Sequence, residues 1–137
     1  MGILGGLIAG LIFIYFFSKK NKISFLKILN IISPIVPLGQ SIGRFGNYFN
    51  HEIYSVNGQP IWLYESSLDL ILFFFLIKTK QENKTALYLI GYGLIRFFTE
   101  FLRWDTFTVN NIKIGQLISI IFIIIGTTLI YKQKTIK

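Results

Sequence analysis

Residues 112–131 read IKIGQLISIIFIIIGTTLIY and are almost continuously apolar. A helix needs roughly 20 such residues to cross the hydrocarbon core of a bilayer. The whole chain of 137 residues shares this character, with 53% apolar residues, 15% charged residues and a mean hydropathy of +0.59. So much apolar surface does not fit inside a small soluble domain, because such a domain has a large surface for its volume. The sequence therefore predicts an integral membrane protein whose apolar surface contacts lipid.

Four more apolar stretches precede this one, separated by short polar breaks. They cover residues 3–17, 23–43, 61–77 and 86–102, and Pro34 and Pro37 interrupt the second. The first and third stretches are at the short end of what a span requires. Together with residues 112–131 they predict an all-α integral membrane protein of about five transmembrane helices. We expect residues 1–137 to form a single transmembrane domain.

The basic residues indicate an orientation. If each stretch crosses the membrane once, ten of the eleven lysines fall on one side, and only Lys113 falls on the other. Lysines collect on the cytoplasmic side of membrane proteins, so we expect the N-terminus outside and the C-terminus in the cytoplasm. All three arginines break this rule, because Arg44, Arg96 and Arg103 lie near the outer side. Charges held in a membrane need partners or a function, so the arginines mark the candidate site.

The remaining composition excludes several kinds of chemistry. The net charge of +8 follows from the lysines at one side of the membrane, and we expect no nucleic-acid partner. The chain has no cysteine, which excludes disulfides, thiolate zinc sites and a cysteine nucleophile. It has one histidine, His51, which excludes a histidine-rich metal site. We expect neither a metal nor a cofactor.

The densest polar run covers residues 39–54, GQSIGRFGNYFNHEIY. Its candidate site residues are a guanidinium donor, two amides and an acid within nine residues: Arg44, Asn47, Asn50 and Glu52. The planar fork of arginine binds two phosphate oxygens at once, which lysine cannot do. We expect the glycines of this run to allow close backbone approach and positive-φ turns. The alternative is a polar helix end that reaches into the lipid headgroups.

His51, in the same run, is a candidate base that Glu52 would orient. The alternative is an exposed loop histidine without a catalytic role.

A second set of polar residues recurs at helical spacing in the stretch 86–102 and its ends. These residues share one face of a helix: Tyr88, Tyr92, Arg96, Glu100 and Arg103. Arg96 and Glu100 are four residues apart and are expected to pair. Two arginines beside one glutamate leave this face net positive, which suits an anionic headgroup. The alternatives are a structural ion pair that joins two helices, and a transporter in which the pair relays charge.

The stretch 61–77 opens with aromatic and acidic residues. Trp62 and Tyr64 are typical of an interfacial aromatic belt. Glu65 and Asp69 are four residues apart and share a helix face, where they could neutralise Arg44 or Arg103. The sequence does not distinguish between these two partners.

The run at residues 43–54, GRFGNYFNHEIY, resembles the signature of the bacterial prolipoprotein diacylglyceryl transferase family. That signature reads glycine-arginine-x-glycine-asparagine-aromatic-x-asparagine-x-glutamate. Further segments are similar to the family in the same order: Pro34, Pro37-Leu38-Gly39-Gln40, Leu63-Tyr64-Glu65, Gly91-Tyr92, Arg96-Phe97, Glu100-Phe101, Arg103 and Gly115-Gln116. The resemblance covers nearly the whole chain and identifies it as a short or truncated member.

The resemblance implies a metal-free transferase of the bacterial cytoplasmic (inner) membrane, multi-pass, with its active site toward the outer face. Such enzymes move the diacylglyceryl group of phosphatidylglycerol to the lipobox cysteine of a prolipoprotein signal peptide, the first step of lipoprotein maturation. Carried over by position, the catalytic residues would be Arg44, Arg96, Glu52 and Glu100. The substrate-binding residues would be Arg44, Asn47, Asn50, Tyr92, Arg103, Tyr64 and Glu65.

The chain departs from the family pattern at a few positions. The family has a histidine before a Gly-Gly pair, and this chain has Leu4 before Gly5-Gly6. His51 stands where the family signature has a glycine before the glutamate, and Ser55 stands where the signature ends with a glycine. These departures leave an alternative open, in which the chain is a catalytically impaired membrane remnant of the family that still binds lipid.

Overall fold

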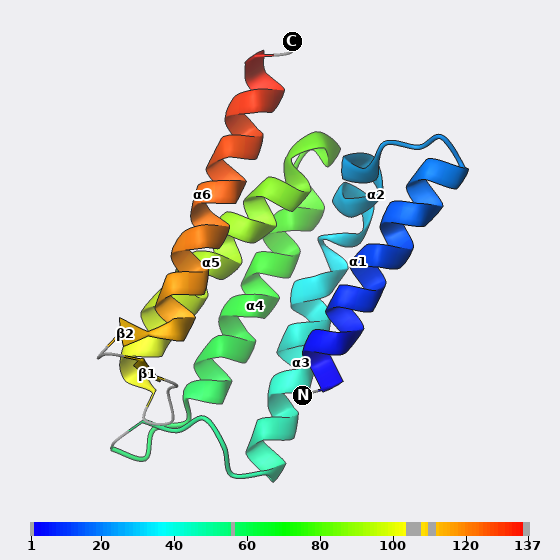
Figure 1. Ribbon diagram of the computed structural model, residues 1–137. Helices are drawn as coiled ribbons and strands as arrows, with labels where there is room; N and C mark the ends of the chain where they lie inside the picture. The colour runs from blue at the N-terminus through cyan, green and yellow to red at the C-terminus, as the bar shows by residue number, and fades with distance from the viewer. Residues whose placement is uncertain (1, 56, 104–107, 110–111, 136–137) are drawn as a thin grey trace.

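A computed structural model describes residues 2–55, 57–103, 108–109 and 112–135 as a helical bundle (Figure 1). Its long helices are α1 (Gly2–Lys20), α3 (Ile35–Phe49), α4 (Ile61–Lys78), α5 (Lys84–Leu102) and α6 (Ile114–Thr135). Shorter elements are α2 (Phe25–Ile32), the 3-10 turn η1 (Gln81–Asn83) and the two-residue strands β1 (Thr108–Val109) and β2 (Ile112–Lys113). The side chains of residues 2–8, Leu4 among them, lie outside what is described.

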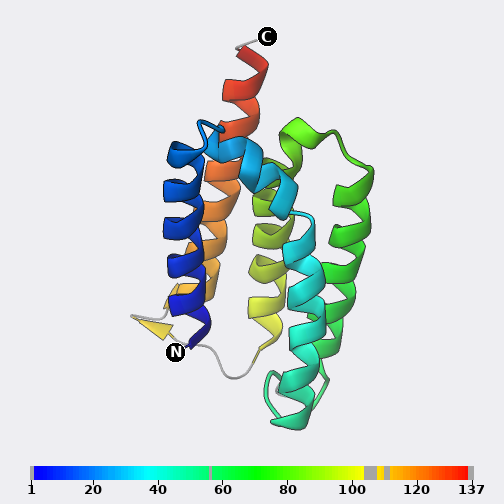
Figure 2. The same ribbon diagram turned by 90° about the vertical axis from the view of Figure 1, so that its right-hand side faces the viewer.

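The helices run up and down along one common direction, as the two views show (Figure 1, Figure 2). The end of α1, the start of α2, the α4–α5 connection and the end of α6 lie at one end of the bundle (Figure 1). These segments carry Lys19, Lys20, Lys22, Lys27, Lys78, Lys80, Lys84 and Lys132. Eight of the ten lysines predicted to share one side of the membrane therefore gather at one end of the bundle, while the Lys134 side chain and Lys137 lie outside what is described.

Two described helices are long and apolar enough to cross a membrane, over residues 81–102 and 114–133. A third span arises if α2 and α3 count together, although their axes bend by 45° at the break between them. Pro34 explains that break, since it has no N–H for the helix ladder and restricts the residue before it. By length and composition, α4 falls short of this criterion because its 18 residues include Glu65, Asp69 and Lys78.

Polar side chains join the helices inside the bundle. Asn30 of α2 is buried and donates from Nδ2 to the Glu82 carbonyl at 2.8 Å, while its Oδ1 accepts from the Thr85 N–H at 2.8 Å. It thereby satisfies one of the free N–H groups at the start of α5. Between α3 and α4, the Ser41 and Ser66 hydroxyls lie 3.0 Å apart. Such bonds fix the facing sides of helices that share an apolar exterior.

Helices α5 and α6 pack closely because small residues line their interface. A Cβ built on Gly93 would lie 2.9 Å from the Ser119 carbonyl oxygen, and one on Gly126 would lie 2.7 Å from the Ala86 carbonyl oxygen. Larger side chains would therefore push the two backbones apart. The close approach holds α5, which carries Arg96 and Glu100, firmly against α6.

The loop between α3 and α4 covers a small apolar cluster of Ile53, Ile61 and Trp62. Trp62 is only 8% exposed and its ring lies 5.7 Å from Phe45 and 5.2 Å from Tyr48. The expectation that Trp62 belongs to an interfacial belt is therefore wrong, because packing under the loop removes it from the surface.

Candidate active site

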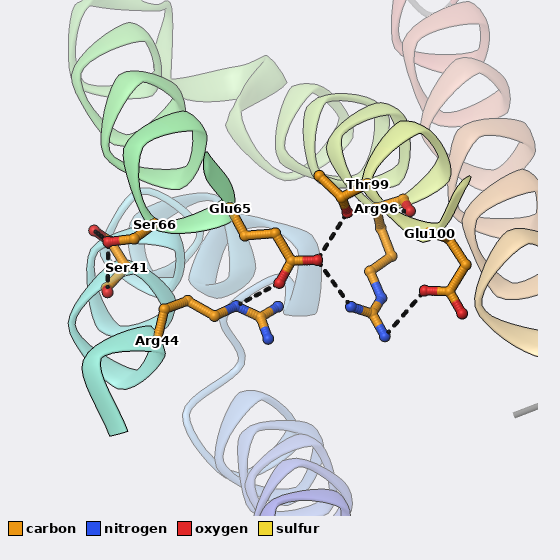
Figure 3. Close-up of polar contacts among 7 residues, drawn as sticks. All are labelled: Ser41, Arg44, Glu65, Ser66, Arg96, Thr99 and Glu100. Atoms are coloured by element: carbon orange, nitrogen blue, oxygen red, sulfur yellow. Dashed lines mark hydrogen bonds and ion pairs between the residues drawn. The ribbon is translucent and has the colours of Figure 1, made fainter. Parts of the chain in front are cut away.

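Three helices bring two arginines and two glutamates together inside the bundle (Figure 3). Glu65 of α4 lies between the arginines: its Oε2 is 3.1 Å from Arg44 Nε, and its Oε1 is 3.2 Å from Arg96 Nη1. Arg96 Nη2 lies 3.4 Å from Glu100 Oε2, which confirms the pair expected from the four-residue spacing. Thr99 Oγ1 donates to Glu65 Oε1 at 2.8 Å. Glu65 therefore ties α3 to α5 through ion pairs with both arginines.

The two guanidinium groups differ in what their contacts leave available. Arg44 meets Glu65 through Nε, and Figure 3 draws no contact from its two terminal nitrogens, which point toward Arg96. Arg96 uses one terminal nitrogen for each glutamate. The arginine side chains keep 17% and 24% exposure, against 1% for Glu65 and 3% for Glu100. Carboxylates on the buried side thus hold two donors that a ligand can reach.

A cavity of about 530 Å³ opens beside this cluster. Its lining comes from α3 and α5 and consists of Val36, Gly39, Gln40, Gly43, Arg44, Asn47, Tyr92 and Arg96. Both arginines, Asn47 and Tyr92 were expected at the site, and the structure places them on one cavity wall. The cavity has the size of an ordinary small-ligand site, with few polar groups that converge on it.

The glycines of the polar run do not act as expected. Gly39, Gly43 and Gly46 all lie within α3, and no heavy atom lies within 4 Å of a Cβ built on any of them. The predictions of positive-φ turns and of close backbone approach at these glycines are therefore wrong. The helix continues through them because helical φ and ψ suit glycine as well as other residues. Their missing side chains leave open space, and Gly39 and Gly43 border the cavity.

The net positive face expected from Arg96, Glu100 and Arg103 stays a prediction, and the cluster that the described residues form with Arg44 has no surplus of positive charge. Two arginines meet two glutamates, and Asp69 adds a third carboxyl group that interacts electrostatically with Arg44 and Arg96. The sequence left open whether the acids of α4 meet Arg44 or Arg103, and the structure pairs Glu65 with Arg44 and Arg96. Arg103 is the residue after α5 and does not line the cavity.

Glu100 is also packed against the start of α6. A Cβ on Gly115 would lie between 2.5 and 2.6 Å from both carboxylate oxygens of Glu100. Nearby, Lys113 Nζ donates to the Glu100 carbonyl at 2.6 Å, so the end of α5 is held from β2 as well. The absence of a side chain at Gly115 thus makes room for the carboxylate that pairs with Arg96.

The remaining expected site residues lie away from the cavity lining. Asn50, His51 and Glu52 are exposed in the loop after α3, and Tyr64 is 45% exposed on α4. His51 has φ 54° and Ile53 has φ 62°, so Glu52 stands between two residues in the left-handed region. That region costs a residue with a Cβ roughly 1–3 kcal/mol, and strain of this kind is common at functional loops.

Several residues of the site were not predicted from the sequence. Gln40 lines the cavity only through the packing of α3. Thr99 donates to an acid on another helix. Its one signal in the sequence is its position three residues after Arg96, which places it on nearly the same helix face. In the part of the chain that the structure describes, no three metal-ligating side chains gather, and the expectation of no metal stays a prediction.

A family profile and several curated proteins are similar to this chain. A family profile described as prolipoprotein diacylglyceryl transferase matches residues 1–132. The phosphatidylglycerol–prolipoprotein diacylglyceryl transferase of Finegoldia magna is 38% identical over 158 residues, covering 100% of this chain and 64% of the relative. Proteins of the same name from Streptococcus sanguinis (34% identical, 100% of this chain, 63% of the relative) and Clostridium novyi (33%, 98%, 63%) are also similar.

This chain therefore spans slightly less than two thirds of the length of the curated relatives that it matches. The profile match runs through nearly the whole chain and includes the helices that carry both arginines and both glutamates. The chain belongs to the prolipoprotein diacylglyceryl transferase family.

Proposed function

We propose that this chain transfers the diacylglyceryl group of phosphatidylglycerol to the lipobox cysteine of prolipoproteins. The observation that carries the proposal is the pair Arg44 and Arg96 on one cavity wall, with Glu65 holding both. Guanidinium groups that are fixed before the ligand arrives suit the phosphate of a phospholipid headgroup. The names of the relatives state the same donor and acceptor for those proteins.

In the proposed reaction, the cysteine sulfur attacks the carbon of the diacylglycerol unit that is bonded to a phosphate oxygen. A C–S bond forms, the C–O bond breaks, and its electron pair leaves with glycerol phosphate. Arg44 binds the phosphate through its terminal nitrogens, and Arg96 stabilises the negative charge that grows on the leaving group. Asn47 and Tyr92 complete the wall that holds the headgroup.

The thiol must lose its proton before it attacks, since the thiolate is the nucleophile. In this proposal, Glu52, Glu100 or His51 accepts the proton from the thiol. Glu100 already lies against Arg96, whereas His51 and Glu52 are exposed in the loop after α3. In this scheme Asn50, Tyr64 and Arg103 contact the lipid or the signal peptide at the mouth of the site.

We also propose five membrane spans within one domain, an outer N-terminus and a cytoplasmic C-terminus in the bacterial inner membrane. The gathered lysines would then face the cytoplasm, and the arginine cluster would lie in the outer half of the bilayer. This placement suits an acceptor that is presented at the outer face.

Substitution of Arg44 by lysine tests the proposal because it keeps the charge and removes the fork. In liposomes that contain phosphatidylglycerol and a lipobox peptide, Arg44→Lys should lower transfer by about 100-fold, the scale of one lost transition-state donor. Lys84→Arg, at the lysine-rich end, makes a comparable swap outside the site and should keep the wild-type rate. An unchanged rate in Arg44→Lys would contradict the role of Arg44.

The same assay separates the enzyme from a catalytically impaired, lipid-binding family member. Wild-type protein that binds phosphatidylglycerol without forming product, under conditions where a relative forms it, would support the impaired form. Product formation by the wild type would exclude it.

A further inference from the structure

The carboxylate of Glu65 is divided between two arginines of different helices. Its Oε2 lies 3.1 Å from Arg44 Nε, and its Oε1 lies 3.2 Å from Arg96 Nη1. The strongest pairing of a carboxylate with an arginine is bidentate, with both oxygens on one guanidinium group. The last side-chain torsion of glutamate has broad energy minima, so it does not fix which oxygen faces which arginine. The divided arrangement therefore depends on a further contact of the carboxylate.

Thr99 of α5 makes such a contact. Its Oγ1 donates to Glu65 Oε1 at 2.8 Å, on the same oxygen that accepts from Arg96 (Figure 3). Thr99 is 3% exposed and Glu65 is 1% exposed, so solvent has little access to this bond. The Arg96 carbonyl oxygen is a second acceptor for the hydroxyl, but it is more distant, at 3.4 Å. The single hydroxyl proton of Thr99 is therefore directed to Glu65.

The two donors on Oε1 decide what remains for Arg44. With Thr99 and Arg96 both on Oε1, the carboxylate is held so that Oε2 faces Arg44 of α3. A turn of the carboxylate toward bidentate pairing with Arg96 would break the short Thr99 bond and withdraw Oε2 from Arg44. Arg44 lines the cavity and would then lose the contact that fixes its Nε.

We propose that Thr99 is a positioning residue, whose hydroxyl keeps the Glu65 carboxylate divided and so holds Arg44 ready for the phosphate of the donor lipid. The inference rests on the proposed function and extends it to a residue that does not line the cavity. It assigns the role to the hydroxyl group of Thr99 and not to the packing of the side chain.

Titration of the full chain in detergent micelles with short-chain phosphatidylglycerol tests this role. Thr99→Val keeps the shape of the side chain and removes the donor. The affinity should therefore fall about tenfold, the scale of one hydrogen bond to a charged group. Thr99→Ser keeps the donor and should stay within about twofold of the wild type.

Thr85→Val is the matched control, because it makes the same substitution on the same helix. The Thr85 hydroxyl is buried near the lysine-rich end of the bundle, where it accepts from Ser33 Oγ at 3.0 Å. Its removal should leave the affinity for phosphatidylglycerol within about twofold of the wild type. A tenfold loss in Thr85→Val would show that any buried hydroxyl of α5 has this effect, and it would overturn the role of Thr99.

The Arg44→Lys background separates positioning from a structural role. An ammonium group is a point charge that pairs with either carboxylate oxygen, so the orientation of Glu65 no longer matters there. Thr99→Val should then lower the affinity by less than about twofold. A tenfold loss in this background would overturn the inference, because Thr99 would then affect binding without acting through Arg44.

Two further results would overturn the inference. They are wild-type affinity in Thr99→Val, and a loss in Thr99→Ser as large as in Thr99→Val, which would assign the effect to the methyl group. If Thr99→Val does not fold, Thr99→Ser and Thr99→Ala make the same comparison, since these two variants differ by the hydroxyl alone.

All of these results concern variants and leave the proposed function intact, because the wild type still binds and transfers. Failure of the proposed function would appear in the wild type itself. Binding without product would contradict the transfer and leave the role of Thr99 to the titrations, whereas no binding of phosphatidylglycerol would overturn both proposals.

Discussion

Substituting alanine for Gly115 tests whether the Glu100 carboxylate holds Arg96 in place. The new methyl group would lie 2.5 Å from Glu100 Oε1 and 2.6 Å from Oε2, where ordinary contact begins near 3.4 Å. The carboxylate must therefore retreat by nearly 1 Å or rotate away. It can do so because it is the far end of a flexible side chain, so the helices need not separate. The Arg96–Glu100 pair, now 3.4 Å long, is the contact that is lost.

The expected loss of transfer rate in Gly115→Ala depends on which contacts of Arg96 remain. The Arg96–Glu100 contact is an ion pair and not a hydrogen bond. Loss of its partner costs a buried polar group about 1–3 kcal/mol, which corresponds to roughly 5- to 150-fold in rate. Glu65 still holds Arg96 at 3.2 Å, so we expect the lower half of that range. The free energy of unfolding should change little. Alanine within a helix is up to about 1 kcal/mol more stable than glycine, which offsets part of the stability lost with the Arg96–Glu100 pair.

The assay is diacylglyceryl transfer in liposomes, measured with the thermal midpoint of the same sample. Gly10→Ala in α1 is the matched control, since no atom lies within 4 Å of a Cβ there, and it should keep full transfer. The decisive measurement is a double-mutant cycle with Glu100→Ala. Gly115→Ala should cost almost nothing in that background, and an undiminished cost would refute the reasoning, because no carboxylate is left to displace.

Three other substitutions test the site and its loop. Glu65→Gln removes the counter-ion of two half-buried arginines and should lower the free energy of unfolding in detergent by about 3–5 kcal/mol, whereas Glu52→Gln, exposed in the loop, should change it by less than about 0.5 kcal/mol. His51→Gly relieves a positive φ and should raise that free energy by about 1 kcal/mol in denaturant titrations. Gly43→Leu should fold and lower phosphatidylglycerol affinity at least tenfold in lipid titrations, whereas Gly46→Leu, outside the cavity lining, should not.

The positions of the helices could be predicted from the sequence because lipid demands long apolar segments. The expected stretches at 61–77 and 86–102 correspond to α4 and α5 within two residues at each end. The second stretch differs most from its expected bounds: it divides at Pro34, and α3 continues to Phe49, six residues beyond the expected end. Hydropathy alone ends a span at the first polar residues, although polar residues continue a helix readily when they face a cavity or a neighbouring helix.

Contacts between helices were less predictable because they depend on how each helix is rotated about its axis. The Arg96–Glu100 pair follows from spacing within one helix and was predicted. The bridge from Glu65 to both arginines joins three helices, and the sequence offered Arg44 or Arg103 as the partner, so the contact with Arg96 was missed. Asn30 gave no signal, because its two partners lie more than 50 residues away along the chain.

The glycines show how the same residue type has opposite uses in this membrane bundle. At Gly93 and Gly126 a missing side chain lets two helices touch, as membrane helices commonly do. At Gly39 and Gly43 the same absence leaves a wall of α3 open, next to Arg44 on the same helix. A glycine-rich helix in lipid therefore indicates either contact or space. Nearby charged residues distinguish contact from open space here. A guanidinium group buried against a partner helix would need a partner for each of its donors. One beside a cavity keeps donors for a ligand.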